Sequence, residues 1–581
     1  MIIRLSDNVI TPLGNTTGEN YSAVKAGQLA LSRHEQLWGI PEPFVASLFT
    51  EKQTLALAIE GFTRFESLAI RSASKAIADT DIDPASKRTL FILSTTKANI
   101  ELLAPDTAEA EAVTPSVAAK RIAAYLDITT EPVVVCNACI SGVAAIVLAL
   151  RLLDANIYDK AIICGADVQN KFTVSGFQSL HAMSDNKCRP FDIERLGLNL
   201  GEAAATLVVG RHDGTDETSN KWAIERGAIR NDAFHISSPS KNGDGARLAL
   251  EAVTDNIDTT ELALINAHGT ATLFNDQMES VAIEGAGLSA IPVNGLKGYF
   301  GHTLGAAGLL ETILTMAAID DHTILATRGF DESGVSGHIS ISPENQATEK
   351  TAFIKMISGF GGCNGAILAK RGETGGAGAS AESRFLSAKR LQPLRKLHSV
   401  RLTPHSLCID GRDIPQTECG GALLTSLYKS RVADYPKFYK MDGLCRLGFV
   451  ATELLLQQEQ RQRFVPTSDR SVILMNHSSS VFADRKYLQS IASADDYFPS
   501  PSVFVYTLPN IVTGEIAMRN SYHGETSFYI VASRNDILAA NIVSASLADA
   551  SANSAVAGWI DYYDDSHFEA DIYIAEIALV T

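Results

Sequence analysis

The chain has 581 residues, of which 46% are hydrophobic and 20% are charged, and this composition is typical of a soluble protein that buries a large core. The formal net charge of −17 argues against a general nucleic-acid-binding protein, because such proteins present a basic face to the phosphates. The sequence has no apolar run long enough for a membrane span and no secretory leader, and its eight cysteines lack metal-ligand or disulfide spacing. We therefore expect a cytoplasmic protein.

Strand-like and helix-like segments alternate along the first 371 residues. The expected strands are 89–93, 132–138, 161–166, 204–209, 262–267 and 353–358, and the expected helices are 66–79, 117–125, 141–156, 247–254 and 305–319. Alternation of this kind predicts an α/β layered fold. Residues 372–383, Gly-Glu-Thr-Gly-Gly-Ala-Gly-Ala-Ser-Ala-Glu-Ser, are too small and polar to pack and predict a flexible linker between a domain at 1–371 and another at 384–581.

The second domain resembles the opening half of the first. A helix expected at 446–458, a strand at 471–476, a helix at 512–519 and a strand at 529–531 repeat the order of segments that leads to Cys139. Counting back from Gly558 by the spacing that separates Cys139 from Gly165 ends near Ala532. No cysteine stands there, so the second domain is expected to have no counterpart of Cys139.

Cys139 stands where an apolar strand meets a long apolar helix, in the sequence Val-Val-Val-Cys-Asn-Ala-Cys139-Ile-Ser-Gly. The positive end of a helix favours the thiolate, which is the nucleophilic form of cysteine, and its free N–H groups can bind an oxyanion. A lone cysteine at a strand end is more often a small buried hydrophobic residue. The placement therefore indicates a nucleophile only if other reactive groups accompany it.

Three further clusters supply such groups, although each alone is typical of an ordinary turn, a solvated side chain or a helix contact. They are Asn266-Ala-His268-Gly-Thr270-Ala-Thr272, Lys297-Gly-Tyr-Phe-Gly301-His302-Thr-Leu-Gly305-Ala-Ala-Gly308-Leu-Leu-Glu311, and Ser358-Gly-Phe360-Gly-Gly-Cys-Asn364. The order and spacing of all four clusters are therefore the informative feature.

Together the clusters resemble the elongating β-ketoacyl-acyl carrier protein synthases of the thiolase superfamily, over about residues 1–370. That family has a Thr-Ala-Cys motif, a His-Gly-Thr motif with a Thr two residues later, a Lys five residues before the His of a Gly-His pair, and a Gly-Phe-Gly-Gly turn. The segments Thr-Pro-Leu-Gly-Asn at 11–15 and Arg-Pro-Phe-Asp at 189–192 also match. The resemblance implies a thiolase-like layered αβαβα fold, followed by a half thiolase-like α/β domain.

The resemblance also implies a role for each site residue. Cys139 would attack an acyl-carrier thioester and hold the acyl chain, with the backbone N–H groups of Cys139 and Phe360 as the oxyanion hole. His268 and His302 would stabilise the enolate formed when malonyl-acyl carrier protein loses CO2, Lys297 would supply positive charge, and Phe360 would gate the site. The supporting residues would be Glu311, paired with the lysine, and Thr270 and Thr272. No metal and no dissociable cofactor is implied.

Three departures from the family pattern leave the acyl substrate open. Asn137 stands where Thr is usual, Ile140 follows the nucleophile where a small residue is commoner, and Tyr-Phe at 299–300 replaces Met-Thr. One alternative is a thiolase acting on CoA thioesters, in which Cys363 would be the second cysteine. Another is a non-catalytic subunit that binds carrier proteins.

The second domain resembles the N-terminal half of the same family without its nucleophile, as in a chain-length factor. We therefore expect ketosynthase-type pairing, within the chain or between copies, with acyl carrier protein and malonyl-acyl carrier protein as partners. The pathway favoured is specialised polyketide or polyene synthesis, of the aryl-polyene or flexirubin type, with housekeeping fatty-acid elongation as the alternative. Two basic stretches are candidates for carrier docking. They comprise Arg384, Lys389, Arg390, Arg395, Lys396 and Arg401 in one, and Lys120 and Arg121 in the other.

Overall fold

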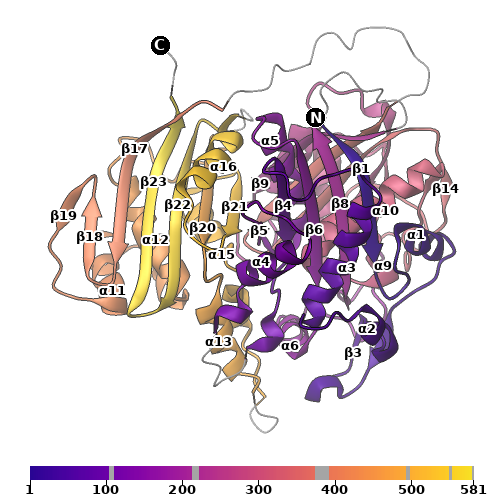
Figure 1. Ribbon diagram of the computed structural model, residues 1–581, viewed down its shortest axis with the longest axis horizontal. Coiled ribbons are helices and arrows are strands. Elements are labelled where there is room, and N and C mark those ends of the chain that lie inside the picture. The colour runs from indigo at the N-terminus through magenta and orange to yellow at the C-terminus, as the bar shows by residue number, and fades with distance from the viewer. Residues whose placement is uncertain (104–109, 212–220, 373–390, 493–496, 549–551, 579–581) are drawn as a thin grey trace.

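The computed structural model describes residues 1–581 except 104–109, 212–220, 373–390, 493–496, 549–551 and 579–581. All of the predicted linker except Gly372 lies outside the described residues, as do Arg384, Lys389 and Arg390 of the basic stretch. The chain before the linker and the chain after it lie side by side, coloured indigo to pink and orange to yellow in Figure 1. Among the described helices, none is both long and apolar enough to cross a membrane.

The first region contains two sheets. Strand pairing gives the first sheet the order β5-β4-β6-β8-β1, in which β4, β5 and β6 are parallel and β8 is antiparallel to both of its neighbours. The strands are β1 (Ile2–Ile10), β4 (Thr89–Ser94), β5 (Val133–Val135), β6 (Lys160–Asp167) and β8 (Ala203–Arg211). β4, β5, β6 and β8 are mostly Val, Ile, Leu and Ala because helices cover both faces of this sheet, whereas the edge strand β1 also carries polar residues.

The second sheet has the order β9-β16-β15-β10-β11-β13, and β9 also pairs with the start of β1. Its strands are β9 (Trp222–Asn231), β10 (Leu262–Asn266), β11 (Pro292–Asn294), β13 (Ser340–Ile341), β15 (Ala352–Gly359) and β16 (Cys363–Arg371). The remaining strands of this region are β2 (Ser32–His34), β3 (Phe44–Ser47) and β7 (Leu200–Gly201), which form a small sheet, and the pair β12 (Thr323–Ile324) and β14 (Gln346–Ala347).

Helices complete five layers. The two most apolar helices of the first region, α5 (Ser141–Asp154) and α10 (Ala307–Asp320), are buried between the two sheets, and almost every residue of each is inaccessible to solvent. The outer helices are α3 (Arg64–Ala78) and α4 (Pro115–Tyr125) on the first sheet and α7 (Asp244–Thr254) and α8 (Leu273–Gly285) on the second. Shorter helices are α1 (Thr17–Lys25), α2 (Glu51–Leu57), α6 (Lys171–Ser179) and α9 (Lys297–Phe300). This arrangement confirms the predicted αβαβα fold.

The second region forms a single sheet of the order β21-β20-β22-β23-β17-β18-β19. Its elements are β17 (Leu394–Thr403), β18 (Ser406–Ile409), β19 (Arg412–Ile414), α11 (Gly420–Arg431), α12 (Gly443–Leu456), β20 (Arg470–Asn476), α13 (Val481–Gln489), α14 (Pro501–Phe504), α15 (Ile511–Asn520), β21 (Thr526–Ile530), α16 (Asp536–Ala548), β22 (Ser554–Asp564) and β23 (His567–Ile577). The order β21-β20-β22-β23-β17 repeats β5-β4-β6-β8-β1, with the same parallel and antiparallel pairings.

Strand register places the predicted counterpart of the nucleophile. In the first region Gly165 pairs with Ser94, and Ser94 pairs with Val135, which lies four residues before Cys139. The same two pairings can be followed in the second region, starting from the glycine of β22 that corresponds to Gly165. The residue reached in this way must lie four positions before the counterpart of Cys139.

In the second region Gly558 pairs with Leu474, and Leu474 pairs with Phe528. Four residues after Phe528 comes Ala532. The register therefore leads to the same alanine as the count along the sequence, and this position carries no nucleophile.

The two regions share a continuous set of strands, because β21 pairs with β5 in the antiparallel direction, through Tyr529 with Val135 and Ile530 with Val134. β5 is the strand that leads into Cys139. The second region therefore forms part of the wall behind the predicted nucleophile.

Candidate functional site

Cys139 lies in a sharp turn between β5 and α5. The strand was expected to run to residue 138, but it ends at Val135, because Ala138 adopts the left-handed conformation with φ of 48°. A non-glycine residue rarely adopts this conformation, and such strain clusters at functional sites. Cys139 follows in a single 3-10 turn, and α5 begins at Ser141 with no side-chain cap on its free N–H groups. The turn thus presents the thiol at the positive end of a buried helix.

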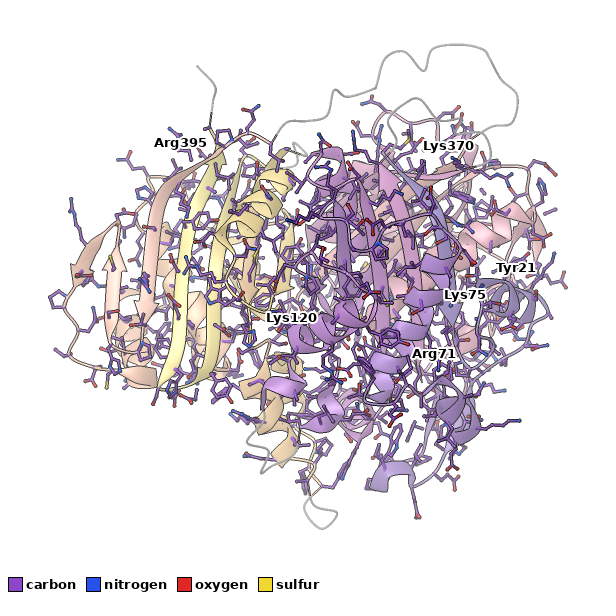
Figure 2. The ribbon with its side chains drawn as sticks, in the orientation of Figure 1. Tyr21, Arg71, Lys75, Lys120, Lys370 and Arg395 are labelled. Atoms are coloured by element: carbon purple, nitrogen blue, oxygen red, sulfur yellow. The ribbon has the colours of Figure 1, made fainter. Side chains whose placement is uncertain are left out.

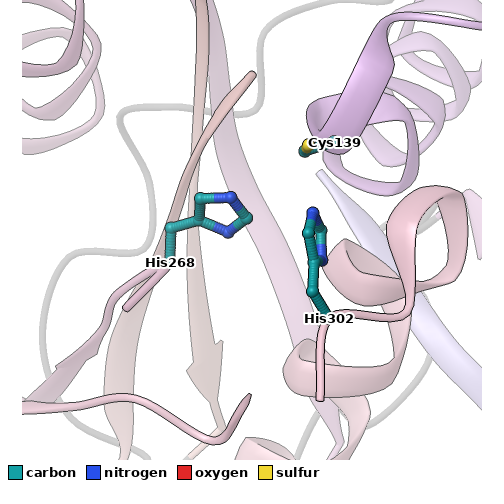
Figure 3. A group of neighbouring side chains, drawn as sticks. All are labelled: Cys139, His268 and His302. Atoms are coloured by element: carbon teal, nitrogen blue, oxygen red, sulfur yellow. The ribbon is translucent and has the colours of Figure 1, made fainter. Parts of the chain in front are cut away.

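The structure brings the predicted nucleophile and both predicted histidines together (Figure 3). One ligand-type atom from each of Cys139, His268 and His302 lies within 4.8 Å of the others, and all three side chains are buried. The two imidazole rings meet edge to face, with 4.9 Å between their centroids. They come from different layers, since His268 follows β10 and His302 lies between α9 and α10.

His302 is held in one tautomer by its own turn. Its Nδ1 accepts the N–H of Leu304 at 3.3 Å, so the neutral ring carries its hydrogen on Nε2. That Nε2 atom is buried and has no partner in the described structure. Burial, together with the charges of Lys297 and Lys355, keeps the pKa of His302 well below its usual value. The residue is therefore a neutral hydrogen-bond donor without an acceptor.

The turn that carries His268 is fixed by buried carboxylates. Glu279 accepts the backbone N–H groups of His268 and Gly269 at 2.6 and 2.8 Å, and burial together with nearby Asp276 raises the pKa of Glu279. Burial is also the main reason that the pKa of His268 lies well below its usual value. The hydroxyls of the predicted supporting residues, Thr270 and Thr272, lie 2.9 Å apart at the cavity wall.

Lys297 and Glu311 pair at 2.6 Å, and both side chains are inaccessible to solvent. Lys297 also donates to the backbone oxygen of His268 at 2.6 Å, which ties the pair to the histidine turn. The other oxygen of Glu311 pairs with Lys355, a residue that the sequence reasoning did not single out. Lys355 is the one charged residue in the apolar run Ala-Phe-Ile-Lys-Met-Ile of β15, and a lone charge in a buried strand was the available signal.

Two backbone N–H groups face the thiol of Cys139, its own and that of Phe360, and both favour the thiolate. They are the predicted oxyanion-hole donors. Burial nevertheless outweighs them and raises the pKa of Cys139 to about 12, so the resting residue is a thiol. The expectation that the helix end alone would favour the thiolate is therefore too simple.

The glycine-rich turn joins β15 to β16 and places Phe360 beside the cavity. Gly361 and Gly362 have φ of 90° and 70°, a conformation that only glycine adopts without strain. The ring of Phe360 stacks on Phe177 with 6.0 Å between centroids. Gly361 donates its N–H to the backbone oxygen of Ile236 at 2.7 Å.

A cavity of about 390 Å³ opens in front of these groups, a size suited to a small molecule or a substrate arm. Cys139, His268 and His302 line it, and apolar side chains line much of the rest. Leu273 and Phe274 also line it, with 57% and 74% of their surfaces exposed. The site can therefore take an extended, mostly apolar molecule whose reactive end meets a thiol and two neutral imidazoles.

Two other chemistries fit the site less well. Cys363 is not among the residues that line the cavity, and its thiol donates to the backbone oxygen of Phe360 at 3.3 Å, so it is not placed as a thiolase acid or base. Cys139, His268 and His302 form the one metal-type cluster found among the described residues. Two buried lysines beside the cluster make the site unfavourable for a cation.

Two protein-family models match the chain. The model of the β-ketoacyl synthase N-terminal domain matches residues 11–214, and that of the C-terminal domain matches residues 223–331. Together the two matches make up more than half of the chain. The chain belongs to the β-ketoacyl synthase family. The named relatives agree. A putative mitochondrial 3-oxoacyl-[acyl-carrier-protein] synthase of Schizosaccharomyces pombe is 28% identical over 415 residues, covering 62% of this chain and 97% of the relative.

The 3-oxoacyl-[acyl-carrier-protein] synthase 2 of Vibrio cholerae is 28% identical over 256 residues, covering 41% of this chain and 62% of that relative. Among solved structures, a β-ketoacyl synthase of Burkholderia phymatum matches 64% of this chain with a TM-score of 0.55 and 24% identity, and 99% of that chain is covered. The PfaC keto synthase–chain length factor matches the whole of this chain and 78% of its own, with a TM-score of 0.74 and 15% identity. At these identities both matches show the fold alone.

The structure describes three residues of the longer basic stretch. Arg395 pairs with Glu576 at 3.0 Å, Arg401 pairs with Glu569 at 3.1 Å, and Lys396 lies over the ring of a tyrosine. Figure 2 shows Arg395 at the edge of the second region. Both arginines are exposed, and surface pairs of this kind are weak, so carrier docking by this stretch stays a prediction.

In the shorter basic stretch, the two cations differ. Arg121 pairs with the buried Glu66 at 2.8 Å. Lys120, labelled in Figure 2, lies 3.9 Å from Glu131 and is half exposed. Of the two, Lys120 is the residue that remains a candidate for carrier docking.

Proposed function

We propose that the chain catalyses the decarboxylative Claisen condensation of an acyl group held on Cys139 with malonyl-acyl carrier protein. Membership of the β-ketoacyl synthase family establishes an acyl-condensing transferase. The observation that carries the specific proposal is the meeting of one buried thiol, two oxyanion donors and two neutral imidazoles at the wall of one mostly apolar cavity.

In the first half-reaction Cys139 attacks the carbonyl carbon of an acyl-carrier thioester. The backbone N–H groups of Cys139 and Phe360 stabilise the negative charge that develops on the carbonyl oxygen. The carrier's carbon–sulfur bond then breaks, and the carrier leaves as a thiol with the proton that Cys139 has lost. The acyl chain stays on the enzyme as a new thioester, and this exchange neither consumes nor releases a net proton.

In the second half-reaction malonyl-carrier thioester occupies the place of the first carrier. Its bond to the carboxylate breaks, CO2 leaves, and the electron pair forms an enolate. The hydrogen on Nε2 of His302 is available to the enolate oxygen, and His268 lies beside it. Neutral donors fit this step, because a charged imidazolium would transfer its proton to the enolate and end the reaction.

The enolate carbon attacks the carbonyl carbon of the acyl thioester, and the tetrahedral intermediate expels the sulfur of Cys139. The product is a β-ketoacyl carrier chain two carbons longer. The sulfur takes up a proton from solvent, and its raised pKa of about 12 favours return to the thiol. The proton taken up here balances the carboxylate charge lost with CO2.

Intact-mass measurement tests the proposal. The full-length protein is incubated with acyl carrier proteins that carry different acyl groups, and the mass of each adduct is recorded. We expect a thioester adduct on the wild type and none on Cys139→Ala. The second half-reaction is followed as ¹⁴CO2 released from malonyl-carrier protein. If no acyl carrier yields an adduct on the wild type, the proposal fails.

The second region is proposed to act as a fixed, nucleophile-free partner of the first. Support comes from its repeated strand order, from Ala532 in place of the cysteine, and from β21, which pairs with the strand that leads to Cys139. Several of the similar solved structures are described as ketosynthases with chain length factors. On this basis we favour polyketide or polyene synthesis of the aryl-polyene or flexirubin type over housekeeping fatty-acid elongation.

Cleavage of the linker tests the partner proposal. A protease site placed within residues 372–383 of the full-length protein is cut after purification. The two fragments are expected to stay together through gel filtration and to keep their condensing activity. A first region that separates from the second and still works at full rate as a homodimer would contradict the proposal. A chain that serves only as a non-catalytic carrier-binding subunit would show no adduct on Cys139 in the preceding test.

A further inference from the structure

The second region also reaches the catalytic turn directly. Asn510, the residue before α15, is 2% exposed, and its Nδ2 donates to the backbone oxygen of Phe360 at 2.8 Å. Space for this amide exists because residue 361 is glycine. A Cβ built on Gly361 would lie 2.8 Å from the Asn510 Nδ2. Gly514 in α15 has no side chain to separate it from the same turn, and its added Cβ would lie 2.5 Å from the Gly361 oxygen.

Hydrogen bonds from both regions hold the Phe360 turn. The N–H of Gly361 donates to the oxygen of Ile236, and the oxygen of Gly361 accepts from Asn231 at 2.8 Å, both in the first region. The oxygen of Phe360 accepts from Asn510 of the second region. Asn510 is therefore the side chain through which the second region helps to fix this turn.

A second contact reaches the same turn through aromatic rings. Phe504 of α14 meets Phe177 edge to face with 5.6 Å between centroids, and Phe177 stacks on Phe360. The Phe504 ring occupies the space over Gly176, where an added Cβ would lie 2.0 Å from a ring carbon. The second region thus contacts both the backbone and, through one intermediate ring, the side chain of Phe360.

We propose that Asn510 is a positioning residue for the condensation and that the catalytic site is incomplete without the second region. Asn510 fixes the Phe360 turn so that the Phe360 N–H points at the reacting carbonyl oxygen above Cys139. The inference rests on the proposed acylation of Cys139. It adds that the geometry of one oxyanion donor is set by a residue outside the 11–331 segment that carries the family match.

Replacement by a residue of the same shape tests the role. Asn510→Asp keeps the size of the side chain but removes the donor and sets a carboxylate oxygen against the Phe360 oxygen. A shift of the oxyanion donor by about 1 Å costs on the order of 100-fold in rate, so we expect Cys139 acylation to slow by about 10- to 100-fold. The rate is measured in the full-length protein by rapid quench and intact mass.

Alkylation of Cys139 by iodoacetamide provides the second readout. This reaction needs the thiolate, which the Phe360 N–H also favours, but it forms no oxyanion that needs stabilising. Its rate is therefore expected to fall clearly less than the rate of acylation in Asn510→Asp. Equal slowing of both reactions would assign Asn510 a general structural role and overturn the proposal. Asn510→Ala, which deletes the donor without adding charge, gives the same test if the aspartate variant does not fold.

The matched control breaks a different contact between the regions. Glu525→Gln weakens the ion pair of Glu525 with Arg151, which joins them at 2.7 Å. Arg151 lies twelve residues along the chain from Cys139, roughly 18 Å along a helix axis. We expect normal acylation in this control. Equal acylation in wild type and Asn510→Asp would refute the inference while leaving the proposed function intact, whereas no acylation in the wild type would refute the function itself.

Discussion

Asn137 stands where the family usually has Thr, and its side chain binds the second region. Its Oδ1 accepts the N–H of Phe528 at 2.7 Å, and its Nδ2 faces the oxygen of Thr526 at 3.4 Å. The side chain therefore extends the pairing of β5 with β21 beyond the end of β5. Asn137→Leu keeps the volume and removes both bonds, so the two regions are expected to bind each other more weakly.

The size of the effect follows from the two bonds. A buried Phe528 N–H left without an acceptor costs about 1–3 kcal/mol, and the longer contact to Thr526 adds less than about 1 kcal/mol. A total of about 2–3 kcal/mol corresponds to an increase of about 30- to 150-fold in the dissociation constant of the two regions. The measurement uses linker-cleaved full-length protein, diluted in steps and followed by mass photometry.

The control for this prediction is Thr312→Val. Thr312 is buried in α10, and its hydroxyl bonds only to Gly308 of the same helix among the described contacts. This variant removes a buried hydrogen bond from the first region but no contact with the second, so its fragments should stay together as in the wild type. Fragments of Asn137→Leu that resist dilution as well as the wild type would show that the amide does not join the regions.

Three further predictions concern charge and packing. Because the pKa values of both site histidines lie well below 6.5, decarboxylation should stay constant from about pH 8 to pH 6 and fall only in more acidic solution, as a pH–rate profile would reveal. Glu311→Gln leaves two buried ammonium groups without their shared anion and should lower the free energy of unfolding by about 3–5 kcal/mol in urea titration. Gly176→Ala should lower the free energy of unfolding by about 1–3 kcal/mol, because the added methyl group clashes with the ring of Phe504. The double variant with Phe504→Ala should be destabilised by less than the sum of the two single variants. Additive effects would show that the ring moves freely aside.

Much of the fold could be predicted because its signals are local. The apolar run before Cys139 and the long apolar segment after it lie at a strand and a helix of the structure, since burial on both faces leaves no polar alternation. The error at the end of β5 has a local cause as well. Asn137 and Ala138 are compatible with a strand by composition, but the chain turns there to place the thiol.

The residues that were missed depend on distant neighbours. Lys355 belongs with Glu311 only after β15 and α10 meet, and no spacing rule connects positions 44 residues apart. Asn510 lies 150 residues from Phe360 in the sequence, within a region that was expected only to dock. The partners of the basic stretch could not be predicted for the same reason. Its charges cluster in the sequence, and strand pairing gives Arg395 and Arg401 acidic partners on β23.

A decayed copy kept only for solubility remains the alternative to a partner role for the second region, and the surface of its sheet bears on this choice. In the first region, the face of β1 and β8 toward α10 is apolar and inaccessible, as at Val9 and Leu207. The counterpart strands β17 and β23 have no second sheet beside them among the described residues, and they carry the ion pair of Arg401 with Glu569. Asp571 of β23 pairs with Arg534, which lies just before α16.

The parts of the second region that meet the first hold specific buried contacts. Lys97 pairs with Asp484 at 2.6 Å and Arg151 with Glu525 at 2.7 Å, with little of any of the four side chains exposed. A buried ion pair is strongly destabilising when one partner is removed, so a region kept only for solubility would gain nothing from such pairs. Their presence at the junction favours a second region that binds the synthase.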